Sequence, residues 1–207
     1  MAVVAAVDLV GPTLDVLELW PWVLERFLGQ RDVVVTLAVG LVAAVVLGPP
    51  LARREHTSAF LVVLALAASA VVVAATIVPE RGYPTLAGAP IPAPGWASWW
   101  RGGWDPDPAF LVTGIDGPFN IMLFAPAGAL WTAAVRRPTQ VWAALVAASI
   151  IIETLQAFTG LREASVNDVV ANGIGAGIGV VVGIVWSAAT DRLTRTRPSP
   201  TTRGDDR

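Results

Sequence analysis

Twenty consecutive residues, 59–78 (AFLVVLALAASAVVVAATIV), carry no charged side chain. A helix of this length measures about 30 Å, which is the thickness of the hydrocarbon core of a bilayer. Only 14% of all residues are charged and 55% are hydrophobic, whereas soluble domains carry about 25% charged residues. The sequence therefore predicts an integral membrane protein.

Four further apolar segments are long enough to cross a membrane, although the shortest of them needs its flanking residues to do so. The shortest segment is the first, and it is followed by Pro49 and Pro50. Together with residues 59–78, the four segments predict an all-α, polytopic transmembrane helical bundle of about five spans. They are residues 33–47, 118–135, 139–158 and 168–189.

The apolar segment 13–28 (TLDVLELWPWVLERFL) differs from these spans because four charged residues interrupt it. A charge at the centre of a bilayer costs several kcal/mol. We therefore interpret this segment as an N-terminal interfacial amphipathic helix rather than a sixth span.

Five regions follow from this pattern. The loop at 79–116 is rich in Pro and Trp. Its Trp residues indicate either an aromatic belt at the lipid headgroups or a lid or sugar-stacking surface over a site at the outer face. The polar, Pro-containing tail is typical of a disordered segment. The predicted regions are an interfacial segment (1–32), two transmembrane helices (33–78), the outer Trp/Pro-rich loop (79–116), a three-helix core (117–189) and a disordered cytoplasmic tail (190–207).

The distribution of arginine predicts the orientation. All 14 basic residues are Arg, a usage that, with the abundance of Ala, Val and Gly, suggests a bacterial source. Cytoplasmic segments collect basic residues, and an outside N-terminus puts nine Arg on the cytoplasmic side and five on the outer side. We therefore predict a multi-pass protein of the bacterial cytoplasmic membrane, with its N-terminus outside and its C-terminus cytoplasmic.

Several kinds of chemistry are excluded by composition. The chain has no Cys, which excludes disulfides, thiol nucleophiles and Cys-ligated metals. Its one His, His56, lies in the loop RREH, so a single chain offers no His–His metal site and no Ser–His triad inside the membrane. A net charge of −2 argues against nucleic acid as a partner.

Polar residues inside the last three spans predict a shared site. Ser149, Glu153 and Gln156 lie on one face of a helix because they are spaced i, i+4, i+7. Charged and amide side chains within spans usually face the bundle interior. Two more spans bring polar residues to a similar depth near the predicted outer surface. These are Asn120 in the third span and Asp168 and Asn172 in the fifth.

Small residues in the same spans predict close helix packing. Gly175, Gly179 and Gly183 form a stripe that lets another helix approach, and Gly128 lies on the inward face of the third span. Pro126 cannot donate a backbone hydrogen bond, and we expect a kink there that opens the bundle on its outer side.

Ordered motifs within residues 117–183 resemble the VanZ-like family of bacterial membrane proteins. The stretch FNIMLFAPAGAL supplies an Asn before LFxPxG, and SIIIETLQ supplies S-x3-E-x2-Q. Arg162 and the pattern D-x3-N-x2-G-x3-G follow. The matching residues are Asn120, Phe124, Pro126, Gly128, Ser149, Glu153, Gln156, Arg162, Asp168, Asn172, Gly175 and Gly179.

The resemblance implies a role in the cell envelope. The family's namesake is associated with resistance to teicoplanin, a lipoglycopeptide antibiotic that acts outside the cytoplasmic membrane. We therefore expect a site at the outer leaflet for a lipid-linked or anionic lipid ligand, such as a lipid-linked cell-wall precursor or a lipoglycopeptide. The residues expected to bind it are Asn120, Gln156, Arg162 and Asn172.

Three hypotheses remain for the polar residues. In an enzyme, Glu153 and Asp168 would be an acid/base pair or ligands of a divalent cation, and Arg162 would hold a phosphate. In a binding protein, the same residues would hold a headgroup without turnover. In a structural protein, Glu153 would pair with Arg162, Gln156 would bond Asn172 or Asn120, and Asp168 would cap its helix.

Overall fold

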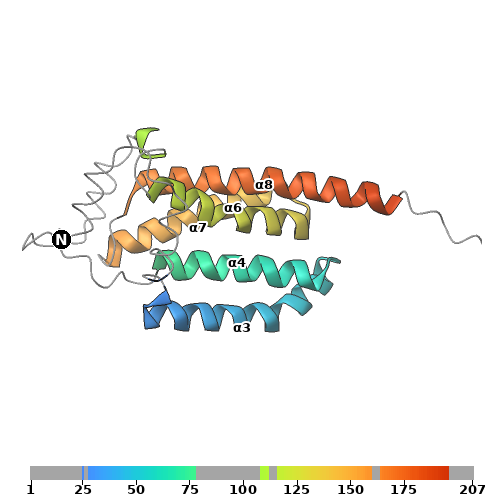
Figure 1. The fold of residues 1–207 in the computed structure, drawn as a ribbon, viewed down its shortest axis with the longest axis horizontal. Helices are drawn as coiled ribbons and strands as arrows, with labels where there is room; N and C mark the ends of the chain where they lie inside the picture. Colours follow the sequence, from blue (N-terminus) through green and yellow to red (C-terminus); the bar gives the residue numbers. More distant parts are fainter. Residues whose placement is uncertain (1–24, 26–27, 78–107, 112–115, 160–163, 196–207) are drawn as a thin grey trace, which may run out of the picture.

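The described part of the chain is entirely helical, with no strand among its residues. The computed structural model describes residues 25, 28–77, 108–111, 116–159 and 164–195. Its elements are α3 (Arg31–Arg54), α4 (Ala59–Ile77), the short 3-10 helix η2 (Pro108–Leu111), α6 (Asp116–Val135), α7 (Pro138–Thr159) and α8 (Val166–Arg195), all labelled or coloured by sequence in Figure 1.

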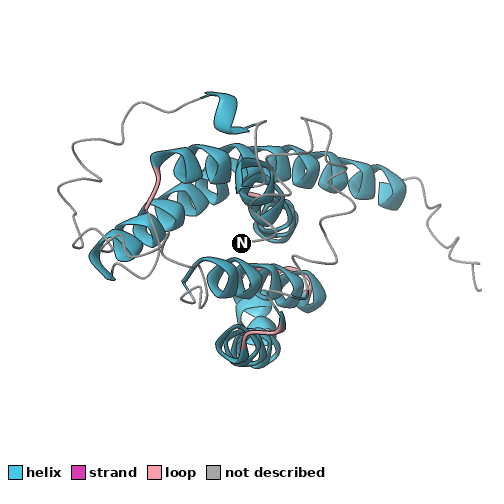
Figure 2. Ribbon diagram, turned by 60° about the vertical axis from the view of Figure 1, so that its left-hand side comes forward, coloured by secondary structure: helices cyan, strands magenta, loops and turns pink. Residues whose placement is uncertain are grey.

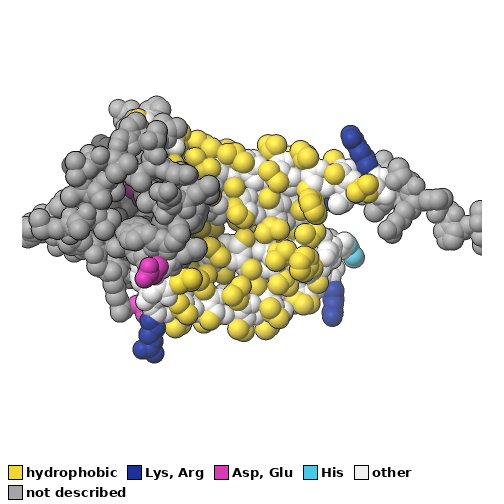
Figure 3. All heavy atoms as spheres, viewed as in Figure 1, with side chains coloured by type: hydrophobic (Ala, Val, Ile, Leu, Met, Phe, Trp, Pro, Cys, Tyr) yellow, Lys and Arg dark blue, Asp and Glu magenta, His cyan; other side chains and the backbone are white. Residues whose placement is uncertain are grey.

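The five α-helices are all long and apolar enough to cross a membrane. Figure 3 shows hydrophobic side chains covering the middle of the described helices, with acidic, basic and His side chains toward the two ends. This is the distribution expected of a surface that meets hydrocarbon. The prediction of a polytopic helical membrane protein with five spans is confirmed.

Successive long helices run in opposite directions (Figure 1). One end of the bundle therefore holds the first residues of α3, α6 and α8 and the last residues of α4 and α7. We refer to it as the α8 N-terminal end. The opposite end, where α8 projects past the other helices, is referred to as the α8 C-terminal end.

The helices pack around α6. It makes its most extensive contact with α8 and also packs on α4, whereas α3 packs chiefly on α4 at the edge of the bundle (Figures 1 and 2). One buried cluster joins four helices: Val72 of α4, Phe124 and Ala127 of α6, Ile152 of α7 and Ala176 of α8.

The turn between α6 and α7 follows from three residues. Arg136 has a φ of 55°, in the left-handed region that commonly ends a helix. Arg137 follows, and Pro138 begins α7, the first helical position where the missing N–H of proline has no cost.

Two predicted boundaries differ from the structure. Pro49 and Pro50 do not end the first span, because α3 continues through both to Arg54. Its last turn is held by Ala52, which is buried against Val62 of α4 and Ala134 of α6, and such packing outweighs intrinsic helix propensity. The predicted tail begins at residue 190, whereas α8 continues to Arg195.

Other predictions fall outside the described residues. These are most of the interfacial segment 1–32, most of the Trp-rich loop 79–116 with Trp96, Trp99, Trp100 and Trp104, and residues 196–207 of the tail. Within the loop region, the structure describes η2 and the first residue of α6.

Candidate functional site

The polar face predicted on α7 is buried inside the bundle. Ser149 is completely buried, Glu153 is 2% exposed and Gln156 is buried as well. On the opposite face, the large hydrophobic side chains at 150, 151 and 155 are exposed toward the region that lipid occupies. The periodicity of SIIIETLQ thus separates a polar inner face from an apolar outer one.

Gln156 connects α7 to α4. Its Nε2 donates to the backbone carbonyl of Thr76 at 2.8 Å, and the Thr76 hydroxyl in turn donates to the carbonyl of Val72. This bond joins Gln156 to α4, whereas the structural hypothesis had expected a bond to Asn172 or Asn120. Thr76 was not predicted as part of the site, although a hydroxyl in the last turn of an otherwise apolar span is a recognisable signal.

Glu153 connects the end of α7 to the beginning of α8. One of its carboxylate oxygens, Oε2, accepts a hydrogen bond from the backbone N–H of Ser165 at 2.8 Å. The Ser165 hydroxyl accepts from the N–H of Asn167 at 3.2 Å, as an N-cap residue does. In a capping box, the side chain of the third helical residue accepts a hydrogen bond from the backbone N–H of the N-cap residue. Here the N-cap residue is Ser165, and its N–H donates to Glu153 of α7 instead.

Asp168 connects α8 to α6. Its Oδ1 accepts a hydrogen bond from Nδ2 of Asn120 at 2.8 Å, so an amide and a carboxylate from two spans meet as their depth had predicted. The pair is only partly buried. Asp168 lies in the first turn of α8, where a negative charge is favoured by the helix dipole.

Asn172 lies deeper, between α7 and α8. It is 1% exposed, and its Nδ2 donates to Oγ of Ser149 at 2.9 Å. Its other polar atom, Oδ1, is buried and has no hydrogen-bond partner. An unpaired buried carbonyl is uncommon in folded proteins.

Each carboxylate of the predicted pair accepts a hydrogen bond from the protein. Glu153 accepts from Ser165 and Asp168 accepts from Asn120, both near the first turn of α8. Within the described ranges, no group of three or more acidic or His residues is placed to hold a metal ion. Arg162, the predicted phosphate ligand, lies outside the described residues.

Glycine brings α6 and α8 together beneath this polar cluster. A Cβ added at Gly175 or Gly179 would overlap the backbone of Ile121 or Ala125, and one at Gly183 would lie 2.6 Å from the carbonyl oxygen of Ala129. Gly128 makes the reciprocal contact, because a Cβ there would lie 2.5 Å from the carbonyl oxygen of Ala176. The stripe packs within the monomer.

Pro126 lies inside α6, which continues through it to Val135. The residue is on an exposed face, while Phe124 and Gly128 on either side of it are buried. Met122, whose carbonyl loses its donor through the missing N–H of Pro126, is likewise exposed.

A family model described as VanZ/LLP1 matches residues 60–187. The chain belongs to the VanZ/LLP1 family. The match extends from the second residue of α4 through α6 and α7 to residue 187 of α8, so the VanZ/LLP1 region begins one span earlier than the 117–183 resemblance. Helix α3 precedes the matched residues. No curated protein and no solved structure matches the chain.

Proposed function

We propose that this VanZ/LLP1-family protein binds the polar end of a lipid, or of a lipid-linked envelope molecule, among α6, α7 and α8 at the α8 N-terminal end. The observation that carries the proposal is the buried Oδ1 of Asn172, which has no hydrogen-bond partner. A buried unpaired group costs about 1–3 kcal/mol. A hydroxyl or amine hydrogen of a bound ligand would offset that cost.

The neighbouring residues support the same location. Asn120 and Asp168 form the less buried edge of the cluster, where a headgroup would enter, and Ser149, Glu153 and Gln156 hold the helices around it. Arg162 is three residues before Ser165 and is proposed to hold a ligand phosphate.

The orientation predicted from arginine makes this the outer-leaflet end. The ligand is then an envelope lipid, a lipid-linked cell-wall precursor or a lipoglycopeptide such as teicoplanin, and tolerance to glycopeptides is a consequence to be measured. The proposal is of binding without turnover, in which Glu153 and Asp168 each accept a hydrogen bond from the protein.

A structural role is the second candidate. The bonds Gln156 to Thr76, Asn120 to Asp168 and Asn172 to Ser149 each join two helices, which is what a cluster that only locks the bundle would do. Each such bond contributes about 0.5–1.5 kcal/mol.

The double variant Ser149→Ala/Asn172→Leu separates these two functions. Replacing both partners of a buried bond by apolar groups is nearly neutral for stability, so the variant is expected to fold. The proposal predicts that it loses the lipid or lipid-linked molecule that co-purifies with wild type, measured by native mass spectrometry and lipid analysis. Unchanged co-purified ligand together with unchanged glycopeptide susceptibility would favour the structural role.

A matched control is available on α6. Thr132 is also buried with an unpaired hydroxyl oxygen, but it lies at the α6–α8 contact beside Gly183, far along the helix from Asn120. Thr132→Val should therefore leave the co-purified ligand unchanged. If it removes the ligand as Ser149→Ala/Asn172→Leu does, the effect is general to the bundle and the proposed site is wrong.

A further inference from the structure

The α8 C-terminal end has an excess of positive side chains that the proposed function does not use. Arginines come from the last turn of α3, the α6–α7 turn and the last turns of α8, and among the described residues of this end only two carboxylates accompany them. The arginines are Arg53, Arg54, Arg136, Arg137 and Arg192, and the carboxylates are Glu55 and Asp191.

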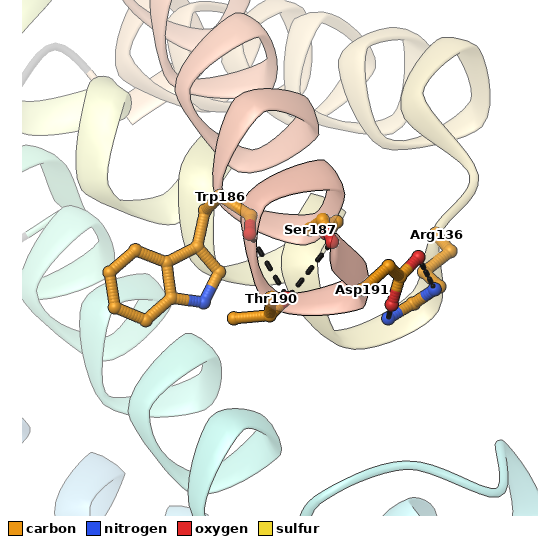
Figure 4. Close-up of polar contacts among 5 residues, drawn as sticks. All are labelled: Arg136, Trp186, Ser187, Thr190 and Asp191. Atoms are coloured by element: carbon orange, nitrogen blue, oxygen red, sulfur yellow. Dashed lines mark hydrogen bonds and ion pairs between the residues drawn. The ribbon is translucent and has the colours of Figure 1, made fainter. Parts of the chain in front are cut away.

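One arginine is fully engaged by the protein. The guanidinium of Arg136 donates two hydrogen bonds to Asp191, both of 2.8 Å, and Figure 4 shows the two side chains meeting between the α6–α7 turn and α8. These hydrogen bonds and the charge of Asp191 raise the pKa of Arg136. The charge of Asp191 is thus matched by that of Arg136.

The remaining carboxylate faces an excess of arginine. Arg137 lies 3.7 Å from Glu55, which brings the α6–α7 turn beside the end of α3. Arg53 and Arg54 immediately precede Glu55, are exposed, and make no ion pair with any residue that the structure describes. One partly exposed carboxylate, that of Glu55, is therefore accompanied by Arg137 in space and by Arg53 and Arg54 in the preceding two positions of the chain.

Apolar residues on α8 place this end at the surface of the membrane. Trp186 is 60% exposed and Leu193 is 70% exposed, and the hydroxyl of Thr190 between them bonds back to the carbonyls of Trp186 and Ser187 (Figure 4). Tryptophan is enriched where hydrocarbon meets headgroups. Asp191, which Arg136 bonds, is five residues beyond Trp186, about 7.5 Å along the helix, and we therefore expect the arginines at the depth of the lipid phosphates.

We propose that Arg53, Arg54 and Arg137 form a basic patch that binds the phosphate of an anionic phospholipid headgroup. Arginine forks match phosphate oxygens, and basic clusters next to a span are attracted to anionic lipid. Two of the three residues come from α3, which precedes the VanZ/LLP1 match. The patch is at the opposite end from the proposed ligand site and does not depend on it.

The test compares lipids that differ only in headgroup. The full chain in neutral detergent is titrated with phosphatidylglycerol or phosphatidylcholine of the same acyl chains, and the shift in melting temperature is recorded. We expect a larger shift with phosphatidylglycerol, and a smaller difference at high salt. In Arg53→Gln/Arg54→Gln the apparent affinity for phosphatidylglycerol should fall about tenfold or more.

Arg31→Gln is the matched control, since it removes an exposed arginine from the other end of α3 and should keep the full shift. Arg137→Gln, on a different helix, gives a second test should the double variant fail to fold. Equal shifts with both lipids, a full phosphatidylglycerol shift in the patch variants, or the same loss in Arg31→Gln would each overturn the proposal. So would an equal shift with inorganic phosphate alone.

Discussion

Two helix pairs in this bundle are built on glycine, but their glycines meet different atoms. In the α6–α8 pair, a Cβ at Gly128 or Gly183 would lie 2.5 or 2.6 Å from a backbone carbonyl oxygen of the partner helix. In the α3–α4 pair, a Cβ at Gly40 or Gly48 would first meet the side chain of Ala70 or Val63. In the α6–α8 pair, relieving such an overlap would move a helix at the centre of the bundle. In the α3–α4 pair, it would move α3, which lies at the edge of the bundle and packs chiefly on α4.

The two pairs also differ in polar contacts. Helix α6, with the turn that follows it, bonds α8 at both ends, through Asn120 to Asp168 and Arg136 to Asp191. In α3, the Thr36 hydroxyl bonds the carbonyl of its own helix at Asp32. Close backbone contact and hydrogen bonds hold together α6 and α8, which present the candidate site. Apolar packing holds α3, which lies outside the family match, against α4.

Gly179→Leu is expected to break the α6–α8 pair and has the largest effect. The new side chain would overlap the backbone of Ala125 and Ala129, so overpacking should destabilise the protein by about 3 kcal/mol or more. The measurement is unfolding in mixed micelles, monitored by circular dichroism. A loss of less than 1 kcal/mol would contradict the close approach.

Gln156→Leu tests the bond from the polar cluster to α4. It leaves the buried carbonyl of Thr76 without this donor and should cost about 1–3 kcal/mol in the same unfolding measurement. Thr154→Val on the same helix is the control, because that hydroxyl bonds only to the Ile150 carbonyl of its own turn on an exposed face. Equal losses in the two variants would show that the α7–α4 bond contributes nothing.

Gly40→Ala tests the weaker glycine contact. The added methyl crowds the Cβ of Ala70, but alanine also gains about 0.8–1.0 kcal/mol of helix propensity over glycine. Because the Cβ of Ala70 is fixed by its own backbone, α3 has to shift to make room. We expect a net loss that is smaller than that of Gly179→Leu, since α3 packs chiefly on α4, measured as above. A loss as large as that of Gly179→Leu would remove the distinction between the two pairs.

Asp191→Asn should have the smallest effect on global stability. The pair with Arg136 is exposed, and exposed ion pairs contribute little. We expect an unchanged melting temperature but faster amide hydrogen exchange in the last turns of α8, where local opening would lose its restraint. Unchanged exchange rates there would mean that the bridge does not hold the end of α8.

The membrane spans could be predicted from the sequence because each depends on local composition. The segments 59–78, 118–135 and 139–158 differ from α4, α6 and α7 by at most two residues at each end. The end of α3 could not be predicted in this way, because contacts of Ala52 with two other helices stabilise the helix beyond Pro49 and Pro50. Near its end, α8 also forms an ion pair with Arg136, which lies 55 positions earlier in the chain than Asp191.

The composition of the polar cluster could likewise be predicted, but its pairings could not. Spacing placed Ser149, Glu153 and Gln156 on one buried face. It could not show that Gln156 bonds the backbone of α4, since the neighbour of each helix face is decided by packing. Nor could it show that Glu153 would bond the N–H of Ser165, because that group carries no sequence signal of its own.

The two polar bonds between α6 and α8 also restrict how these helices can move. Both helices run in the same direction (Figure 1), and the bonds lie near their beginnings and beyond the end of α6. Sliding α8 by one turn, about 5.4 Å, would break both bonds. It would bring a glycine back into two of the three glycine positions, because Gly175, Gly179 and Gly183 are four residues apart, so the polar bonds rather than the glycines select the register. The two bonds therefore set the register of α8 on α6. Movements that open the site without breaking them are tilts of α8, rotations about its axis, or movements of α7.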